Sequence, residues 1–172
     1  MNDTAETLTG ELTIERWTYD GRLLSAETKT VTLPPDRATE VGVFSRTDAA
    51  KAEFLALNLK TPRGNADADY HFAPYRDLPL AWAKIGRKVE NRGGRWTVTL
   101  TADTPAFFVW ANARGMKGEF SDNSFTLLPG RSKVLVFDAK GNDVSLESFN
   151  ANLSVVSLTD SFCGNQCSFL LK

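Results

Sequence analysis

The chain has a single histidine, His71, which stands between Tyr70 and Phe72. A histidine beside a serine and an acid could act as the general base of a nucleophilic triad, but no serine lies in a Gly-x-Ser-x-Gly turn. A metal site built on imidazole needs further histidines or enough cysteines, and the sequence has neither. We therefore expect His71 to be a packed structural side chain, and we expect no metal site.

Pairs of carboxylates could also do chemistry, because glycosidases need only two acids about 5–9.5 Å apart. Asp67 and Asp69 would face the same side of an extended segment, and Asp122 follows Glu119 in a predicted loop. Neither pair lies in an apolar stretch that would raise the pKa of one acid, so we expect solvated side chains. The sequence also lacks a glycine-rich phosphate-binding loop. We expect no catalytic residue and no cofactor.

The two cysteines, Cys163 and Cys167, lie near the carboxyl end. Their spacing differs from the two-residue gap of redox motifs and zinc knuckles. They are either two free thiols, which is the favoured interpretation, or a candidate disulfide that closes a short loop. Residues 1–10 match neither a secretory signal nor a transit peptide, so both a cytoplasmic and an extracytoplasmic location stay open.

Aromatic side chains offer a third kind of chemistry, because a ring face can stack on the apolar face of a sugar. The chain has four tryptophans and eleven phenylalanines. The candidates for a carbohydrate-binding platform are Trp17 with Tyr19, and Trp110 opposite Phe108. A β-sandwich also needs a large buried aromatic residue. We favour the core for both tryptophans and keep the platform as an alternative.

Composition limits the class of protein that holds these residues. The chain has 172 residues, of which 42% are hydrophobic, as is typical of a globular protein. Its formal net charge is -1, without the basic surplus that nucleic-acid binding requires, so no nucleic-acid partner is expected. No apolar run reaches the roughly 18 residues of a membrane span, so no membrane association is expected.

The elements that position these residues have a period of two, which is typical of β-strands. Residues 12–19 change parity near Glu15 and Arg16, which predicts a β-bulge. Asp20 and Gly21 then predict a hairpin turn.

The same period continues along the chain. Residues 54–59 alternate leucines and are predicted as a strand rather than a helix, and residues 41–44 as the start of another strand. Residues 107–111 are apolar on both parities, which is typical of a strand that is covered on both faces.

Short strands separated by turn signals predict an all-β fold made of β-sandwiches. No helix longer than a turn or two is required. Residues 73–80 contain two prolines and no clear period, so we place the domain boundary there. The predicted domains are 1–79 and 80–172.

One segment, residues 107–137, carries more than a pattern. It closely resembles the final Ig-like domain of β-mannosidases of glycoside hydrolase family 2. The matching positions are FVW at 108–110, FSDN at 120–123, Phe125 and LLPG at 127–130. Residues 8–24 and 70–80 resemble the Ig-like domain that follows the catalytic barrel in that family. The resemblance implies two consecutive Ig-like β-sandwich domains, the first without its first strand.

In that family the two domains stand behind a (β/α)₈ barrel with two catalytic glutamates, and the enzyme removes terminal β-D-mannosyl residues. This chain has no room for such a barrel. The resemblance therefore implies a non-catalytic accessory fragment whose partner is the catalytic barrel of a parent chain.

Two alternatives stay open beside the accessory role. One is a carbohydrate-binding module that stacks mannose-containing glycans on exposed aromatics, and the other is an Ig-like pair that binds another protein. The missing strand also predicts an open sheet edge that pairs in a dimer of the fragment.

The matching segment also has a physical interpretation. The side chains of Asp122 and Asn123 can bond nearby backbone groups and set a turn between two strands. Pro129 and Gly130 predict a hairpin turn, with glycine free to adopt a positive φ. We therefore expect the motif to be structural first and a ligand contact second. Its residues are Phe120, Asp122, Asn123, Phe125, Pro129 and Gly130.

Overall fold

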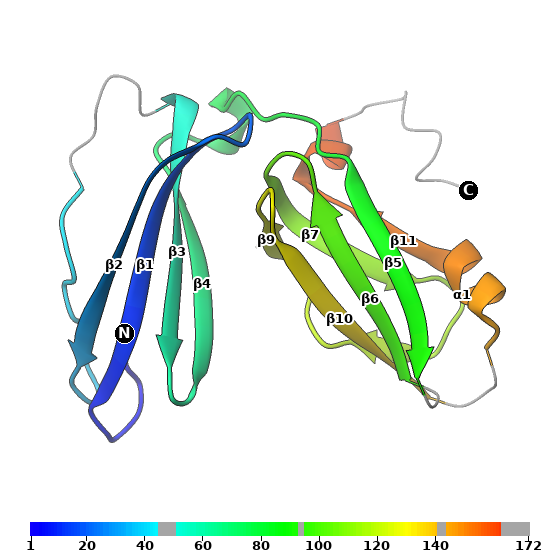
Figure 1. The fold of residues 1–172 in the computed structure, drawn as a ribbon, viewed down its shortest axis with the longest axis horizontal. Helices are drawn as coiled ribbons and strands as arrows, with labels where there is room; N and C mark the ends of the chain where they lie inside the picture. The colour runs from blue at the N-terminus through cyan, green and yellow to red at the C-terminus, as the bar shows by residue number, and fades with distance from the viewer. Residues whose placement is uncertain (45–50, 93–94, 141–143, 163–172) are drawn as a thin grey trace. The chain divides into compact units, whose positions relative to one another are not determined.

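A computed structural model describes residues 1–44, 51–92, 95–140 and 144–162, and the chain divides into two compact units, Met1–Pro79 and Leu80–Lys172 (Figure 1). Nearly all regular structure is β-strand, which confirms the all-β class. Among the described residues no helix is long and apolar enough to cross a membrane.

The first unit is built on one antiparallel sheet of four strands in the order β2-β1-β3-β4 (Figure 1). The predicted turn at Asp20 and Gly21 joins β1 to β2, and the Gly21 amide donates to the Thr18 carbonyl at 3.1 Å. The strand predicted at 54–59 is confirmed as β3. The elements are β1 (Leu8–Thr18), β2 (Leu23–Leu33), β3 (Glu53–Thr61), β4 (Gly64–His71) and the 3-10 turn η2 (Tyr75–Asp77).

The pairing of β1 with β2 shifts register between Arg16 and Trp17, which confirms a β-bulge at the predicted place. The extra residue is Leu24 on β2, because the pairing of β1 with β3 runs through without a break. The parity change in β1 therefore has a second cause. Leu12 and Ile14 are buried on one face of the sheet, whereas Trp17 is buried on the other.

The first unit buries side chains on both faces of its sheet, with Trp17 and Phe54 on one face and a cluster of aliphatic residues on the other. Leu12, Ile14 and Val31 form a buried cluster, and Val41 packs against them. The Val41 carbonyl accepts a hydrogen bond from the Lys29 ammonium group. The prediction that residues 41–44 begin a strand is wrong, because this segment lies on the cluster without joining the sheet. In the described part of the first unit there is therefore one sheet, where a sandwich has two.

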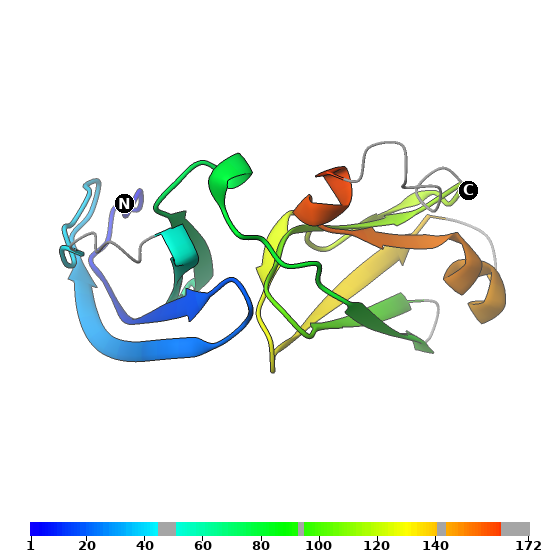
Figure 2. The ribbon, with the colours of Figure 1, turned by 90° about the horizontal axis from the view of Figure 1, so that it is seen from above.

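The second unit has two sheets in separate layers, with β11 in one layer and β5 and β6 in the other (Figure 2). Their order is β5-β6-β10-β8 and β11-β7-β9. Buried side chains from both sheets, such as Leu100, Leu135 and Val109, form a single core. The strands are β5 (Ile85–Arg92), β6 (Arg95–Ala102), β7 (Ala106–Ala113), β8 (Gly118–Phe120), β9 (Phe125–Leu127), β10 (Ser132–Ala139) and β11 (Leu153–Val156).

The second unit also has short helical elements, α1 (Leu146–Asn152) and η3 (Leu158–Phe162). Ser145 caps α1, since its side-chain oxygen accepts from the amide of Ser148 at 3.1 Å. The one buried residue of α1 is Phe149, whose ring stacks on Trp96 with 4.5 Å between centroids and 1° between planes. The helix thus closes one end of the core.

Candidate functional site

His71 lies in a cluster of aromatic rings at one end of the first sheet. Its Nδ1 is 2.9 Å from the Tyr19 hydroxyl, and its ring lies 5.6 Å from Phe54 and 4.8 Å from Tyr75. Burial lowers the pKa of His71 to about 4, so the imidazole is neutral near pH 7. A neutral ring within an aromatic cluster has a structural role, as predicted from the sequence.

The ring partners of His71 differ from those that the sequence placed beside it. Because Tyr70 and Phe72 alternate with His71 along the strand, they lie on the opposite face and contact each other edge-on at 5.1 Å. Burial raises the pKa of Tyr19, and the charges of Tyr75 and Asp69 add to this shift.

The acid pairs lie in open positions. Asp67 and Asp69 are both exposed, and the Asp67 carboxylate accepts from the Asn58 amide at 2.6 Å. Asp122 forms an ion pair of 2.6 Å with Lys133. Within the described residues, no group of three or more His, Cys, Asp or Glu side chains could hold a metal ion.

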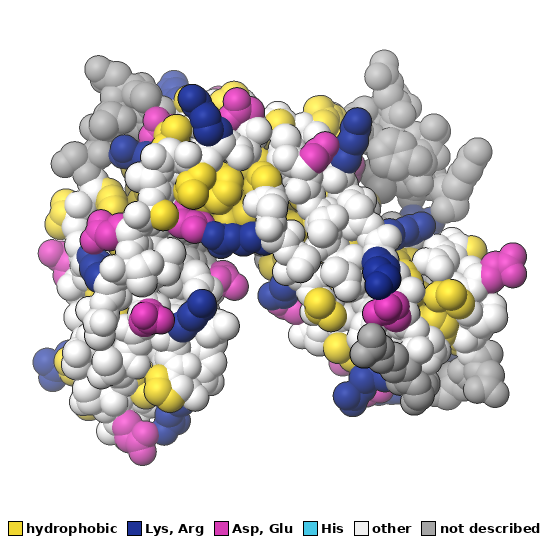
Figure 3. Space-filling view, viewed as in Figure 1, with side chains coloured by type: hydrophobic (Ala, Val, Ile, Leu, Met, Phe, Trp, Pro, Cys, Tyr) yellow, Lys and Arg dark blue, Asp and Glu magenta, His cyan; other side chains and the backbone are white. Residues whose placement is uncertain are grey.

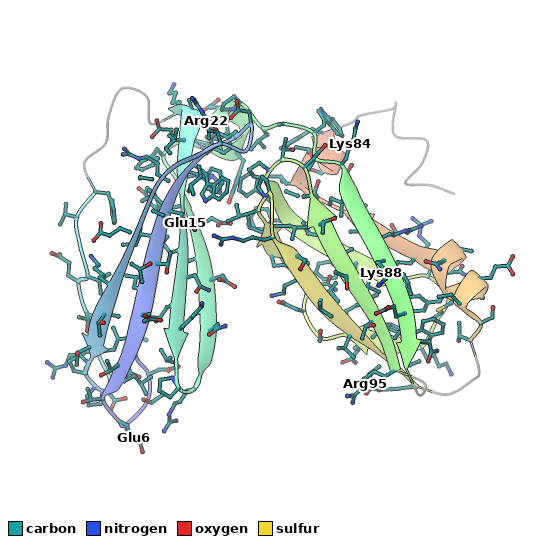
Figure 4. All side chains as sticks on the ribbon, viewed as in Figure 1. Glu6, Glu15, Arg22, Lys84, Lys88 and Arg95 are labelled. Atoms are coloured by element: carbon teal, nitrogen blue, oxygen red, sulfur yellow. The ribbon has the colours of Figure 1, made fainter. Side chains whose placement is uncertain are left out.

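Trp17 and Tyr19 are buried, with 6% and 2% of their surfaces exposed, so neither ring offers a face to a sugar. The Trp17 indole N–H donates to the Glu15 carboxylate at 3.0 Å, and Glu15, which lies on β1 (Figure 4), is buried with it. The platform that the sequence left open for this pair does not match these positions. Trp17 belongs to the core, which was the favoured interpretation.

Trp110, unlike Trp17, is exposed over 51% of its surface. Along β7 the even-numbered residues Phe108, Trp110 and Asn112 are exposed, and the odd-numbered ones are buried. The predictions that Trp110 belongs to the core and that residues 107–111 are covered on both faces are therefore wrong. Because both parities of this strand are apolar, the sequence pattern does not reveal that one face carries exposed aromatic side chains.

Phe108 has a strained backbone. Its φ is 49°, in the left-handed region that bulky side chains rarely adopt, at a register shift between β7 and β9. Such strain costs on the order of 1–3 kcal/mol, and β-bulges of this kind re-aim side chains. The strained residue is 44% exposed and lies two positions before Trp110.

A hollow of about 310 Å³ opens beside Trp110. The rings of Phe120 and Phe137 line it, with 4.9 Å between their centroids. Asn112 and Glu119 supply an amide and a carboxylate. Glu119 is exposed, and Lys140 lies 3.8 Å from its carboxylate. An exposed indole, an apolar floor and a few polar groups can hold a small polar ligand that has apolar faces.

Asn123 lines this hollow, and the predicted local hydrogen bond is present for Asp122, whereas the Asn123 side chain bonds the backbone of β7 twelve residues earlier. Its side chain replaces a missing strand partner, because Oδ1 accepts from the Ala111 amide at 2.7 Å and Nδ2 donates to the Ala111 carbonyl at 3.1 Å. Asp122 accepts from the Asn123 amide at 2.8 Å. The turn between β8 and β9 is thus fixed by side chains.

Pro129 and Gly130 form a turn with a positive φ of 73° at the glycine. The predicted hairpin is wrong, since β9 pairs with β7 whereas β10 pairs with β6 and β8. The turn instead carries the chain from one sheet to the other. Phe125 lies on β9 and packs against the core. Cys163 and Cys167 lie outside the described residues.

The first unit has a second hollow, of about 490 Å³, between residues 42–44 and the strands β3 and β4. Its lining is mostly apolar, with Leu55, Leu57 and Phe72, and the exposed ring of Tyr70. On the face in Figure 3, positive and negative side chains are mixed between small groups of hydrophobic side chains.

Sequence reasoning missed Asn112 and considered Glu119 only as part of an acid pair. The signal for Asn112 was the sequence FVWAN at 108–112, in which it continues the parity of Trp110. A polar side chain at that parity indicates that the face is open to solvent.

Comparison with known proteins matches both units. Residues 1–77 match the family described as mannosidase Ig/CBM-like domain, and residues 80–161 match the mannosidase family described as Ig-fold domain. No curated protein matches the chain in sequence.

Solved structures of glycoside hydrolases are among those that resemble the chain. The β-D-mannosidase from Dictyoglomus thermophilum has a TM-score of 0.73 at 20% identity, over 90% of this chain and 19% of that chain. An exo-chitosanase from Amycolatopsis orientalis has a TM-score of 0.58 at 16% identity, over 91% of this chain and 24% of that chain. The chain thus spans about a fifth to a quarter of these proteins, and at such identities the likeness establishes the fold.

Proposed function

This chain belongs, over residues 1–77 and 80–161, to the mannosidase families of Ig-like domains, and we propose from that premise that it is an accessory part of a glycoside hydrolase. In this proposal the parent enzyme resembles a β-mannosidase and removes terminal β-D-mannosyl residues. The two units support the catalytic barrel of that parent and carry no catalytic residue.

The observation that carries the proposal is the order of the two domains. The two mannosidase-type domains follow each other without a gap longer than two residues, 78 and 79, and a β-D-mannosidase has the same fold over 90% of this chain. A shared fold does not by itself determine an activity. The two family matches are therefore the main support for the proposal, and the structural likeness is secondary.

The acids of the chain also support an accessory role. Two-carboxylate hydrolysis requires one acid in an apolar site that raises its pKa. Asp67 and Asp69 are exposed, and Asp122 is held by Lys133. Glu15 is buried, and its carboxylate accepts a hydrogen bond from the Trp17 indole.

The proposal is tested by immunoprecipitation with an antibody raised against this chain, followed by an assay of the precipitate with an aryl β-mannoside. Source cells are expected to yield β-mannosidase activity in the precipitate, within a polypeptide several times longer than 172 residues. The purified chain by itself is expected to be inactive. A precipitate without glycosidase activity, or turnover by the isolated chain, would contradict the accessory role.

Carbohydrate binding is a second candidate function, and the exposed face of β7 favours it. Phe108 and Trp110 are large aromatic side chains that the fold leaves open to solvent beside a hollow with polar groups. This arrangement differs from that of Trp96 in the same unit, which is buried.

A further inference from the structure

We propose that the hollow beside Trp110 binds one neutral pyranose residue of a glycan, with the indole as the apolar contact and Asn112 and Glu119 as hydrogen-bond partners. This inference deepens the second candidate function and rests on it. It concerns a site within the second unit, and it stands apart from the accessory role.

The first step is the exposure of Trp110. This side chain is half exposed and lines the hollow, so part of its indole is available to a ligand there. The second unit buries Trp96 within its core, so this fold can accommodate a buried indole. Phe108, two positions earlier, is also exposed and holds a strained φ of 49°. Strain of this kind gathers at sites that bind ligands.

The second step is the open edge of β7. The pairing of β9 with β7 ends at Val109, so among the residues that the structure describes no strand pairs with the following residues of β7 on that side. Asn123 fills the first position, where its amide satisfies the N–H and the carbonyl of Ala111. The backbone is thus satisfied without a neighbouring strand, and the space beside it stays open as the hollow.

The third step is the polarity of the hollow. A pyranose has an apolar face that packs on rings and a rim of hydroxyl groups that need donors and acceptors. Trp110 and the partly exposed ring of Phe120 supply the apolar surface, and Asn112 supplies both a donor and an acceptor. A volume of about 310 Å³ is at the small end of ligand sites, which suits one sugar residue.

The fourth step is charge. The Glu119 carboxylate lies 3.8 Å from the Lys140 ammonium group, so its negative charge is partly compensated. The carboxylate can accept hydrogen bonds from the hydroxyl groups of a neutral ligand. The described residues that line the hollow of the first unit are mostly apolar, with the Tyr70 hydroxyl as their polar side-chain group. The observations therefore favour the second unit as the sugar site.

The test is a titration of the ¹⁵N-labelled full chain with mannose and mannobiose, followed by NMR. The indole N–H signals of the four tryptophans are separate probes. The Trp110 signal and the amide signals of residues 110–120 are expected to shift and to saturate. The absence of saturable shifts at these residues would overturn the proposal.

Substitutions make the site specific. Trp110→Ala and Asn112→Ala are expected to weaken mannobiose binding by about tenfold or more, which corresponds to the loss of one good contact. Trp82→Ala is the matched control, because Trp82 is 57% exposed and does not line the hollow. It is expected to leave the affinity within about twofold. Equal losses in the Trp82 and Trp110 variants would contradict the proposal.

The charge of the ligand is tested at Glu119. Glu119→Gln keeps the hydrogen-bonding shape and is expected to retain mannobiose binding, whereas Glu119→Ala is expected to weaken it. Tighter binding of protonated glucosamine than of mannose would overturn the assignment of a neutral sugar. A failure of all sugars to bind would leave the immunoprecipitation result of the accessory role untouched, so the two proposals fail separately.

Discussion

Two tryptophans of the second unit lie in opposite environments, and this difference has a measurable consequence. Trp96 is 2% exposed and stacks on Phe149, whereas Trp110 is 51% exposed. Trp96→Ala is therefore expected to lower the free energy of unfolding by about 3–5 kcal/mol. Trp110→Ala is expected to cost less than about 1 kcal/mol, because little packing is lost. Urea unfolding of both variants measures this difference, and equal losses would show that Trp110 is packed.

His71 gives the first unit a dependence on pH. Its pKa is about 4 in the folded chain and 6.5 in an unfolded one, so between these values the unfolded chain binds the extra proton. The contribution of His71 to the free energy of unfolding is about 3 kcal/mol above pH 6.5. This contribution falls as the pH drops and is lost below pH 4.

The measurement for His71 is a comparison of unfolding free energies of the natural chain and of His71→Gln from pH 7.5 to 4. The difference between the two is expected to shrink toward acid pH, because the glutamine does not titrate. Acids that titrate in the same range are present in both proteins and cancel. Two parallel curves would mean that His71 keeps its ordinary pKa.

The Asn123 side chain makes the hydrogen bonds to Ala111 that a neighbouring strand would otherwise make. Asn123→Ala leaves the buried N–H and carbonyl of Ala111 without these two partners, and is expected to cost about 1–3 kcal/mol of stability. Asn112→Ala, a substitution of the same type at an exposed neighbouring position, is expected to change stability by less than about 0.5 kcal/mol. Thermal unfolding distinguishes the two, and a stable Asn123→Ala variant would refute this role.

At the scale of elements, β8 approaches β10 so closely that it has no room for a side chain at Gly118. A Cβ there would lie 2.4 Å from the Asp138 carbonyl oxygen and 2.5 Å from the Phe137 ring. Gly118→Ala is therefore expected to destabilise the second unit by more than about 2 kcal/mol. Gly115→Ala, with nothing within 4 Å of the added Cβ, is the control and carries only the cost of its positive φ. Equal unfolding midpoints of the two variants would contradict this close approach.

The strands that the sequence predicts are those with clear alternation. Residues 54–59 alternate leucines, and they form β3. Residues 107–111 form a strand too, but Phe108 and Trp110 are as apolar as their buried neighbours, so within this segment alternation does not show which face is exposed. The signal lies one residue beyond it, in the polar Asn112 at the parity of Trp110. The strained bulge at Phe108 depends on the pairing with β9, which periodicity along one strand does not contain.

The turn residues also show that local sequence predicts a bend but not which strands the bend connects. The bends at Asp20 and at Gly130 were predictable, since both are local preferences of the backbone. Whether a bend joins two paired strands or two sheets depends on the partners of those strands. For this reason the hairpin at Gly21 is present and the one at Gly130 is a crossing between sheets. The hollow beside Trp110 lies where the pairing of β9 with β7 ends, and that end point depends on strand partners rather than on a local pattern.

At the scale of the whole molecule, the two units differ in how much core they possess. The second unit joins buried residues of both sheets and of α1 into one cluster. In the described part of the first unit the buried side chains are divided between the two faces of one sheet, with Leu12, Ile14 and Val31 on one face and Trp17 on the other. A domain of this size is stable only if it buries enough apolar surface to offset the entropy of ordering its chain. A core that is divided by its own sheet gives less mutual packing than the single cluster of the second unit.

We therefore expect residues 80–172 to fold when they are expressed without the first unit, and residues 1–79 to be marginal when expressed alone. The second fragment should give a dispersed NMR spectrum and a cooperative thermal transition, because its core is contained within it. The first fragment should give a broad transition at a lower temperature. If residues 1–79 unfold as cooperatively as residues 80–172, then the buried side chains on the two faces of this sheet are enough to stabilise it, and the expected difference between the two fragments is wrong.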